Sequence, residues 1–422
     1  MKLSALAARL GVVENSAPRL PAADTLLGPG ADEMVAVAVE AGGGRLLSLA
    51  RNQVLHRPGR ALTVRFSAEV AWAGDVRTRE TVVAMAGVDG PPEGTLVLEA
   101  GDERVGLFRY PHDPLLPGLV AATSPDAVAE RIGHRVAEGG LTVVAYRPAR
   151  RAVVRVDLAG GGQRYLKVVP PSEAPALVAR LDRLAGVVPA PRVLSRHVAE
   201  GLVELEAIPG RTLRDALRAD RVGRVTATGP ARPPEPGRVL EVLERLDTVD
   251  VTDLAPHWTV PEMARGLGAM LSAVLPTEAE RLAALGHELG REVPQRQVAV
   301  HGDLHPAQFL VQRSTITGVL DLDDLGPGAR VDDLATFLGH VVAFGVEGDQ
   351  PPARRYAARL LPVFGEATDP DELRRRTAAV LLGLATGPYR VQQPDWPEAC
   401  RRRIALAERW ALGDVRSLRE AS

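Results

Sequence analysis

The alternation of apolar and polar positions changes at about residue 135. Before that point, short runs alternate with the period of a half-buried β-strand, and turn-rich segments separate them. Three of these runs are predicted strands: Leu62–Phe66, Thr95–Glu99 and Arg104–Phe108. We expect residues 1–135 to form an N-terminal α+β module of a cap-like or regulatory kind.

Residues 136–207 are predicted to form a β-rich lobe with one helix. The glycines at 160–162 join two β-type runs, which is a hairpin signal. The predicted strands are Val153–Leu158, Tyr165–Val169, Val193–Ser195 and Leu202–Leu205. A helix is predicted over Ser172–Leu184, because Ser172 is a suitable N-cap and prolines follow the segment.

Residues 208–422 are predicted to form a mainly helical lobe. Apolar residues recur there at i, i+3 and i+4, the period of an amphipathic helix. The predicted helices include Thr212–Leu217, Val239–Leu246, Pro261–Leu275 and Glu278–Leu289. Two short strands, Gln297–His301 and Gly318–Asp321, interrupt this pattern, and the Pro/Gly-rich Thr226–Gly237 reads as an exposed loop. The fold class is therefore α+β.

Two segments 90 residues apart resemble each other. His56–Phe66 (HRPGRALTVRF) and Tyr146–Val156 (YRPARRAVVRV) share Arg, Pro, Arg, Val and Arg at matching positions. One interpretation is a duplicated β-hairpin unit, and the other is coincidence in an Arg-rich chain.

The net charge indicates the class of partner, and the cysteine content indicates the redox compartment. The formal net charge is -2, so no global field favours nucleic acid or an anionic membrane, and a small molecule is the expected ligand. Cys400 is the only cysteine, which excludes an internal disulfide and favours a reducing compartment. The segment Met1–Val13 has Arg9 within its apolar stretch and reads as a short amphipathic helix rather than a signal peptide. A cytoplasmic protein is expected, and the sequence leaves its oligomeric state open.

Lysine is nearly absent from the chain, whose only lysines are Lys2 and Lys167. Lysine is a compact point charge that the wide guanidinium fork of arginine does not replace where space is tight. Lys167 lies in a predicted strand, so a specific role is expected for it. The alternative is chance retention on a strand surface.

The strongest chemical signal is the segment at 301–308 (HGDLHPAQ), followed by the segment at 318–324 (GVLDLDD). Phosphoryl transfer needs a group beside the acceptor hydroxyl, ligands for Mg²⁺ and positive charge on the nucleotide phosphates. Asp303 precedes Gln308 by five residues, the spacing of the catalytic Asp and metal-binding Asn in a kinase loop. Asp321 follows a short β run, where a carboxylate can bind Mg²⁺. Together with Lys167, these residues predict an ATP- and Mg²⁺-dependent kinase.

These residues resemble the aminoglycoside phosphotransferase and choline kinase-like family, a branch of the two-lobed protein kinase-like fold. The resemblance covers about Leu141 to Ala343 and includes HGDLHP, the V-L-D-L-D strand and the D-L-A run that begins at Asp333. It implies the γ-phosphoryl group of ATP as donor and a hydroxyl of a sugar, amino sugar or aminoglycoside as acceptor. The acceptor pocket would then lie among the C-terminal helices.

The resemblance also implies roles for single residues. Asp303 is the expected catalytic base, Gln308 and Asp321 the Mg²⁺ ligands, and Lys167 the phosphate-binding cation. Asp333 is expected to brace the catalytic loop. His301 is expected to order that loop through hydrogen bonds rather than to titrate.

Further residues are expected at the nucleotide. Glu173 is the candidate partner of Lys167, and Glu204 to Ala207 fall where the hinge of this family receives adenine. The turn within Tyr146–Ala152 (YRPARRA) lacks the usual glycines, so Arg147, Arg150 and Arg151 are expected to supply charge to the phosphates.

Gln308 stands where the family usually has Asn. Gln at this position resembles the maltokinase and related sugar-kinase branch, which also carries an extra domain before the kinase lobes. The DFEGEP-like run of maltokinases is replaced by Asp321–Gly326 (DLDDLG), which argues against maltose as the acceptor.

Three other functions fit parts of this sequence pattern. A non-catalytic kinase-like protein that binds nucleotide or a partner is the main alternative, because Gln308 and the turn without glycine depart from the family pattern. A protein kinase is disfavoured because the D-F-G and A-P-E motifs are missing. The run at 302–305 (GDLH) resembles the G-D-x-H of metallophosphoesterases, but only the isolated His340 follows downstream of Asp333.

Overall fold

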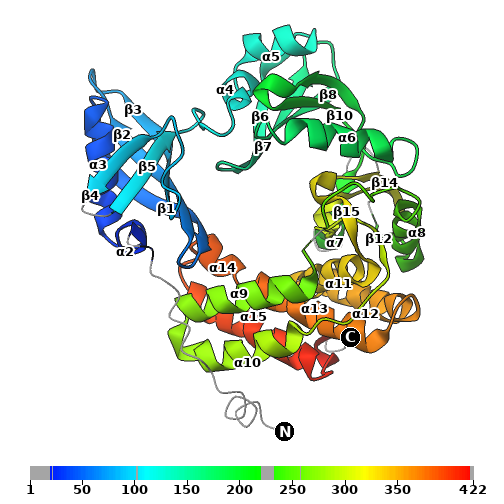
Figure 1. The fold of residues 1–422 in the computed structure, drawn as a ribbon. Coiled ribbons are helices and arrows are strands. Elements are labelled where there is room, and N and C mark those ends of the chain that lie inside the picture. Colours follow the sequence, from blue (N-terminus) through cyan, green and yellow to red (C-terminus); the bar gives the residue numbers. More distant parts are fainter. Residues whose placement is uncertain (1–19, 21, 101–102, 220–231, 257, 419–422) are drawn as a thin grey trace.

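The computed structural model describes residues 20, 22–100, 103–219, 232–256 and 258–418. Figure 1 shows a β-sheet of residues 45–109 on the left, a second sheet of residues 136–206 at the top, and a helical part at the lower right. The predicted two-lobed α+β fold is confirmed. The expected helix Met1–Val13, and the loop Thr226–Gly237 up to residue 231, lie outside the described residues.

The first sheet is antiparallel with the strand order β1-β2-β3-β5-β4. Its strands are β1 (Arg45–Arg57), β2 (Ala61–Ala71), β3 (Arg77–Gly87), β4 (Leu96–Ala100) and β5 (Glu103–Arg109). Every second residue of β2 from Leu62 to Val70 is buried, which places one face of the sheet on a core with α2 (Ala22–Leu27) and α3 (Gly30–Ala41). The predicted strands Leu62–Phe66 and Arg104–Phe108 lie within β2 and β5, and Thr95–Glu99 overlaps β4 except at Thr95.

The second sheet repeats this strand order as β6-β7-β8-β10-β9. Its strands are β6 (Val136–Arg147), β7 (Arg151–Leu158), β8 (Gln163–Val168), β9 (Val193–His197) and β10 (Leu202–Glu206). One face packs on α4 (Gly118–Ala122) and α5 (Pro125–Ile132), and the other packs on α6 (Ala174–Leu184). The helices α4 and α5 fall within the range 1–135 assigned to the N-terminal module, and the division of the chain at 135 and 207 stays a prediction.

The two similar segments occupy equivalent places in these sheets. His56–Phe66 forms the turn between β1 and β2, where Arg57 pairs with Ala61, and Tyr146–Val156 forms the turn between β6 and β7, where Arg147 pairs with Arg151. Each is the first hairpin of a sheet with the same order, so the topology favours a duplicated hairpin unit.

The N-terminal sheet contacts both other parts of the chain. The Tyr389 hydroxyl lies 3.3 Å from Nδ1 of His56, and β1 packs against α14 (Gly387–Arg390). The Arg65 guanidinium donates to the carbonyl of Tyr146 at 3.2 Å. The first hairpin therefore touches the second hairpin and the helical part at once.

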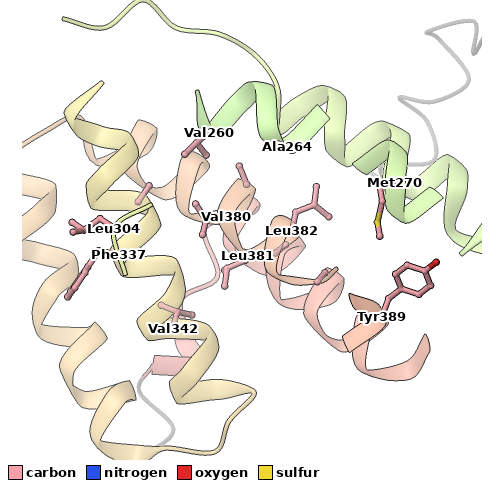
Figure 2. Close-up of a cluster of buried hydrophobic side chains, with 14 of the residues drawn as sticks. Val260, Ala264, Met270, Leu304, Phe337, Val342, Val380, Leu381, Leu382 and Tyr389 are labelled. Atoms are coloured by element: carbon pink, nitrogen blue, oxygen red, sulfur yellow. The ribbon is translucent and has the colours of Figure 1, made fainter. Parts of the chain in front are cut away.

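The helical part contains α7 (Leu213–Ala219), α8 (Pro236–Leu246), α9 (Val260–Val274), α10 (Ala279–Leu289), α11 (Arg330–Val346), α12 (Pro351–Glu366), α13 (Pro370–Leu384), α14 and α15 (Trp396–Ala411). Figure 2 shows buried apolar side chains of α9, α11 and α13 packed together, among them Ala264, Phe337 and Leu381. A capping box of Thr259 and Glu262 begins α9. In the part of the chain that the structure describes, no helix is long and apolar enough to span a membrane.

Short strands in the helical part carry the loops of the candidate site. One pair is β12 (Gln297–Val300) with β15 (Gly326–Ala329), and a three-stranded sheet joins β11 (Arg211–Thr212), β13 (Phe309–Gln312) and β14 (Thr315–Val319). The loop 301–308 leaves β12, and the loop 320–325 leaves β14. The antiparallel pairing brings the two loops side by side.

Gly201, directly before β10, is a position where a side chain does not fit. Its φ is +71°, and a Cβ atom there would lie 2.0 Å from the Val169 carbonyl oxygen. We expect Gly201→Ala to lower the free energy of unfolding by about 2–3 kcal/mol, from backbone strain plus steric overlap. Chemical denaturation would measure the change.

Gly161→Ala is the matched control for this prediction. Gly161 also has a positive φ of +87°, but no atom lies within 4 Å of its Cβ position. Only the backbone strain remains in this variant, and it should lower the free energy of unfolding by about 1 kcal/mol. Equal losses in the two variants would contradict the role assigned to the contact with Val169.

Candidate active site

The loop 301–308 is anchored in the core of the helical part. Leu304 is fully buried, and Figure 2 places it beside Phe337 of α11. Phe309, directly after the loop, meets the ring of Phe337 edge to face at 5.6 Å between centroids. This packing fixes the middle and the end of the loop in the core, while Asp303 and His305 stay partly exposed.

Asp333 and His301 determine the conformation of this loop. The backbone N–H groups of His301 and Gly302 donate to the two carboxylate oxygens of Asp333, in the first turn of α11, at 2.8 and 3.0 Å. Nδ1 of the buried His301 accepts from the N–H of Asp303 at 3.3 Å, so Nε2 carries the proton and donates to the carbonyl of Leu320 at 2.9 Å. The neutral His301 ring thus ties the loop at 301–308 to the loop after β14.

Asp303 is partly exposed at the turn of the loop. In the described ranges its carboxylate makes no hydrogen bond and no ion pair, unlike the carboxylates of Asp321, Asp323 and Asp333 nearby. The loop therefore holds Asp303 through its backbone and leaves the carboxylate oxygens open to a ligand.

Lys167 and Arg151 converge on two aspartates of the loop after β14. Nζ of Lys167 lies 2.8 Å from Oδ1 of Asp321 and 2.5 Å from Oδ1 of Asp323. Arg151 reaches the second oxygens of the same two carboxylates, at 2.5 and 3.1 Å. Two cations of the second sheet and two anions of the helical part form one compact cluster, in which Lys167 is only 5% exposed.

The cluster shifts the pKa of Asp321 and that of Arg151. Burial alone would raise the pKa of Asp321, but Lys167 and Arg151 outweigh it and hold that pKa far below its ordinary value. Burial lowers the pKa of Arg151, and the carboxylates of Asp321 and Asp323 reverse this to a net rise. Asp321 and Arg151 are therefore both charged at neutral pH. The Asp321 backbone is in the left-handed region at φ +59°, which turns its side chain towards the second sheet.

Gln308 joins the loop 301–308 to the loop after β14. Its Nε2 donates to Oδ2 of Asp321 at 3.2 Å and lies 3.2 Å from Nε2 of His305. The His305 ring stacks on His340 of α11 with 4.8 Å between centroids. Burial lowers the pKa of both imidazoles, so the pair is neutral at pH 7.

The donor chemistry of this group fits Mg²⁺. Mg²⁺ prefers oxygen ligands, usually one or two carboxylates completed by water and substrate phosphates. The Asp321 and Asp323 carboxylates and the Gln308 amide provide such oxygens next to one another. Among the described residues no cluster of three or more His, Cys, Asp or Glu stands ready as a metal cage. A metal here would share its ligands with the nucleotide.

The structure does not bring Glu173 to Lys167. Glu173 is exposed at the N-terminus of α6 and forms no ion pair in the described part of the chain. Lys167 bonds Asp321 and Asp323 in its place. The expected Lys167–Glu173 pair is thus not formed, because β8 directs the lysine towards the helical part.

The remaining predicted residues lie along the second sheet. Glu204 in β10 is buried, accepts from the Ser195 hydroxyl at 2.7 Å and lies 3.5 Å from Nε of Arg164. Ala207 follows β10, where the chain crosses to the helical part. Arg150 is exposed in the turn between β6 and β7. Because the Glu204 carboxylate already has Ser195 and Arg164 as partners, the groups of this segment that are available to a ligand are those of its backbone.

The sequence alone leaves Asp323 open between a solvated turn and an auxiliary metal or substrate site, and it gives no sign of Arg390. In the structure Asp323 binds Lys167 as closely as Asp321 does. Arg390 at the end of α14 acts electrostatically on Arg147 and His340. The repeated acidic pattern D-L-D-D was a signal for Asp323, but no local pattern marks Arg390, because α14 lies far along the chain.

The chain is similar in sequence to known phosphotransferases. Residues 147–376 match the phosphotransferase enzyme family. A streptomycin 3''-kinase of Streptomyces griseus is 32% identical over 239 residues, which cover 51% of this chain and 83% of that protein. Aminoglycoside phosphotransferase APH(3'')-Id from Streptomyces rimosus is 25% identical, with a TM-score of 0.38 over 58% of this chain and 93% of that one. Macrolide 2'-phosphotransferase MphH from Brachybacterium faecium is 19% identical, with a TM-score of 0.43 over 66% and 96%.

Proposed function

The chain belongs to the phosphotransferase enzyme family as a small-molecule kinase, and on this premise we propose that it transfers the γ-phosphoryl group of ATP to a hydroxyl of a sugar-like acceptor. The acceptor class is a sugar, an amino sugar or an aminoglycoside. The streptomycin 3''-kinase relative supports that range, and Mg²⁺ is the proposed metal.

One observation carries the proposal. The Asp303 carboxylate makes no bond within the described residues, while the loop that bears it is hydrogen-bonded to Asp333 and, through His301, to the loop of Asp321. A carboxylate held in position but left unsatisfied is what a base for an acceptor hydroxyl requires. A purely structural aspartate would instead be expected to have a partner.

Each residue has a proposed part in the transfer. The acceptor oxygen forms a bond to the γ-phosphorus as the bond between that phosphorus and the β–γ bridging oxygen breaks, and the hydroxyl proton passes to Asp303. Gln308 and Asp321, with Asp323 beside them, would hold Mg²⁺, which when bound neutralises charge on the phosphates. Lys167 supplies further positive charge, so the protein contributes mainly position and electrostatics.

The nucleotide would lie between the second sheet and the helical part. Lys167 and Arg151 neutralise Asp321 and Asp323 in this structure, and the phosphates with their metal would take over part of that pairing. The backbone from Glu204 to Ala207 is proposed to receive the adenine, and Arg147 and Arg150 to face the phosphates from the β6–β7 turn. Glu173 is exposed in this structure, so it would pair with Lys167 only if α6 moved.

Acceptor-dependent release of ADP from MgATP tests this function. We expect release to rise with at least one member of a panel of sugars, sugar derivatives and aminoglycosides, and to stop when EDTA removes the metal. Tight MgATP binding without turnover on any member would instead favour the alternative, a non-catalytic nucleotide-binding protein. Labelled phosphate recovered in protein rather than in the small molecule would point to a protein kinase.

A further inference from the structure

The turn between β6 and β7 adopts a backbone conformation that its sequence does not favour. The N–H of Arg150 donates to the carbonyl of Arg147 at 3.0 Å, and Ala149 within this turn has a φ of +60°. The left-handed region costs free energy for a residue with a Cβ atom, so glycine is the usual residue there. A strained residue of this kind persists where its surroundings hold it in place.

The carboxylate of Asp113 holds this turn from the segment between β5 and α4. Its Oδ2 accepts the backbone N–H of Ala149 at 2.8 Å and the hydroxyl of Tyr146 at 3.0 Å. Its Oδ1 accepts the N–H of Leu115 at 3.0 Å, which orients the carboxylate within its own segment. Two of the three hydrogen bonds therefore lead into the β6–β7 hairpin, and one of them reaches the strained residue itself.

Asp113 is buried without a cationic partner. Only 2% of the residue is exposed, and it forms no ion pair within the described residues. Burial of a carboxylate costs free energy, and it raises the pKa of Asp113, while the hydrogen bonds from Ala149, Tyr146 and Leu115 oppose this rise. Hydrogen bonds to a charged acceptor are stronger than those to a neutral one, so the carboxylate holds the turn more firmly than an amide would.

Two further contacts hold Tyr146 at the end of β6. The guanidinium of Arg65 in β2 donates to its carbonyl at 3.2 Å, and its ring lies 5.2 Å from the ring of Tyr110 between centroids. Tyr110 follows β5 and packs with Leu116 against the core of the second sheet. Figure 1 shows the chain between β5 and α4 as the connection from the first sheet to the second. The first sheet and this connection therefore brace the hairpin together.

The braced turn leads directly into the charged cluster of the candidate active site. Arg151 begins β7 two residues after Ala149. Its guanidinium lies 2.5 Å from Oδ2 of Asp321 and 3.1 Å from Oδ2 of Asp323. Because the backbone of the turn determines where the Arg151 side chain starts, the Asp113 contact also fixes the cation that faces the proposed metal ligands.

We propose that Asp113 is a positioning residue for the nucleotide, which holds the β6–β7 turn in the conformation that receives the phosphates of ATP. In a turn without glycine, its hydrogen bonds stabilise a backbone conformation that glycine would adopt freely. Asp113 does not touch the nucleotide and acts through Ala149 and Arg151. This inference rests on the proposed function, and it makes the segment that joins the first sheet to the second a part of the ATP site.

The test compares three variants with the wild type by calorimetry with the non-hydrolysable AMP-PNP and Mg²⁺, by steady-state kinetics with an acceptor that is turned over, and by amide hydrogen exchange at Ala149. Asp113→Asn keeps the shape of the side chain but replaces one acceptor oxygen by an N–H donor, so it does not satisfy Leu115 and Ala149 together. Tyr146→Phe removes only the hydroxyl bond. Asp369→Asn is the control, because Asp369 also accepts two backbone N–H groups, at the start of α13.

Asp113→Asn is expected to raise the Kd of AMP-PNP and the KM of ATP about 10- to 100-fold, as for the loss of one hydrogen bond to a charged group. The KM of the acceptor should stay nearly unchanged, and amide exchange at Ala149 should become faster. Tyr146→Phe should raise the Kd of AMP-PNP about 2- to 10-fold, because the bond to Ala149 remains. Asp369→Asn should lower stability, as for the loss of a helix cap, and leave the Kd of AMP-PNP unchanged.

Other outcomes overturn the inference separately from the function. Unchanged AMP-PNP affinity in Asp113→Asn, while an acceptor is still phosphorylated, would show that Asp113 is only structural and leave the kinase activity standing. If no acceptor is turned over, the proposed function fails, and calorimetry still decides: weaker AMP-PNP binding in Asp113→Asn supports the positioning role, and equal binding or none in the wild type refutes it. If Asp113→Asn does not fold, the AMP-PNP affinity of Tyr146→Phe decides in the same way.

Discussion

Asp303→Asn is expected to lower acceptor-dependent ADP release by about 100- to 10,000-fold, the usual contribution of a positioned base. The amide has nearly the shape of the carboxylate but does not accept the hydroxyl proton. The loop should keep its conformation, because its hydrogen bonds to Asp333 use backbone N–H groups of His301 and Gly302. Steady-state kinetics would show a fall in kcat, while calorimetry would show MgATP affinity nearly unchanged.

Asp324→Asn is the matched control for the catalytic prediction. Asp324 is an exposed aspartate of the loop after β14, near Asp321 and Asp323, and it makes no side-chain bond in the described residues. Its replacement should change kcat less than about threefold, as for a surface substitution. Comparable losses in both variants, or a fully active Asp303→Asn, would show that Asp303 is not the base.

Arg376→Ala is expected to lower the free energy of unfolding by about 3–5 kcal/mol, the loss typical of breaking a buried charge pair. Arg376 of α13 is 1% exposed and bonds Asp332 of α11 at 2.5 Å and Glu372 at 2.6 Å. Its removal leaves both carboxylates buried next to a cavity. Urea denaturation at pH 7 would measure the loss.

The pH dependence of that loss follows from the carboxylates. Burial raises the pKa of Asp332 even with Arg376 present, and without Arg376 the rise should be larger. A group whose pKa is higher in the folded than in the unfolded state stabilises the fold as pH falls, so the variant should recover part of its deficit between pH 7 and about pH 4.

Arg238→Ala is the control for Arg376→Ala, because its pair with Glu241 is exposed and such pairs contribute at most about 1 kcal/mol. A loss below about 1 kcal/mol in Arg376→Ala would show that the buried ion pairs of Arg376 with Asp332 and Glu372 do not stabilise the packing of α11 against α13.

Local patterns were sufficient for most of the second sheet and for the helices around the site. The bounds of the predicted strands at 153–158 and 165–169 lie within two residues of those of β7 and β8, because alternating Val and Leu positions between Gly-rich turns leave few alternatives. The strands β1 and β3 were missed. Their residues are mostly partly exposed and include many arginines, so the apolar alternation that marks a half-buried strand is weak.

The candidate site also combines residues that local spacing predicts with pairings that local spacing does not predict. The structure brings the predicted Gln308 and Asp321 together and hydrogen-bonds Asp333 to the loop that carries Asp303, because short spacing along the chain reflects spacing in space. Glu173 was assigned to Lys167 by position alone, and the structure joins Lys167 to Asp321 and Asp323, more than 150 residues away. Such pairings depend on how two lobes meet, which a sequence window does not contain.

By itself, the sequence determined the α+β class and most strands of the second sheet, and it predicted the candidate residues at 301–308 and 318–324, because these follow from local periodicity and from spacing within single loops. Only the tertiary structure decided that two sheets share one strand order, that Arg151 joins Lys167 on the aspartates, and that β1 packs against α14. The physical reason is that these features arise from contacts between segments distant in the chain, where burial and charge pairing select one arrangement out of many that local preferences allow.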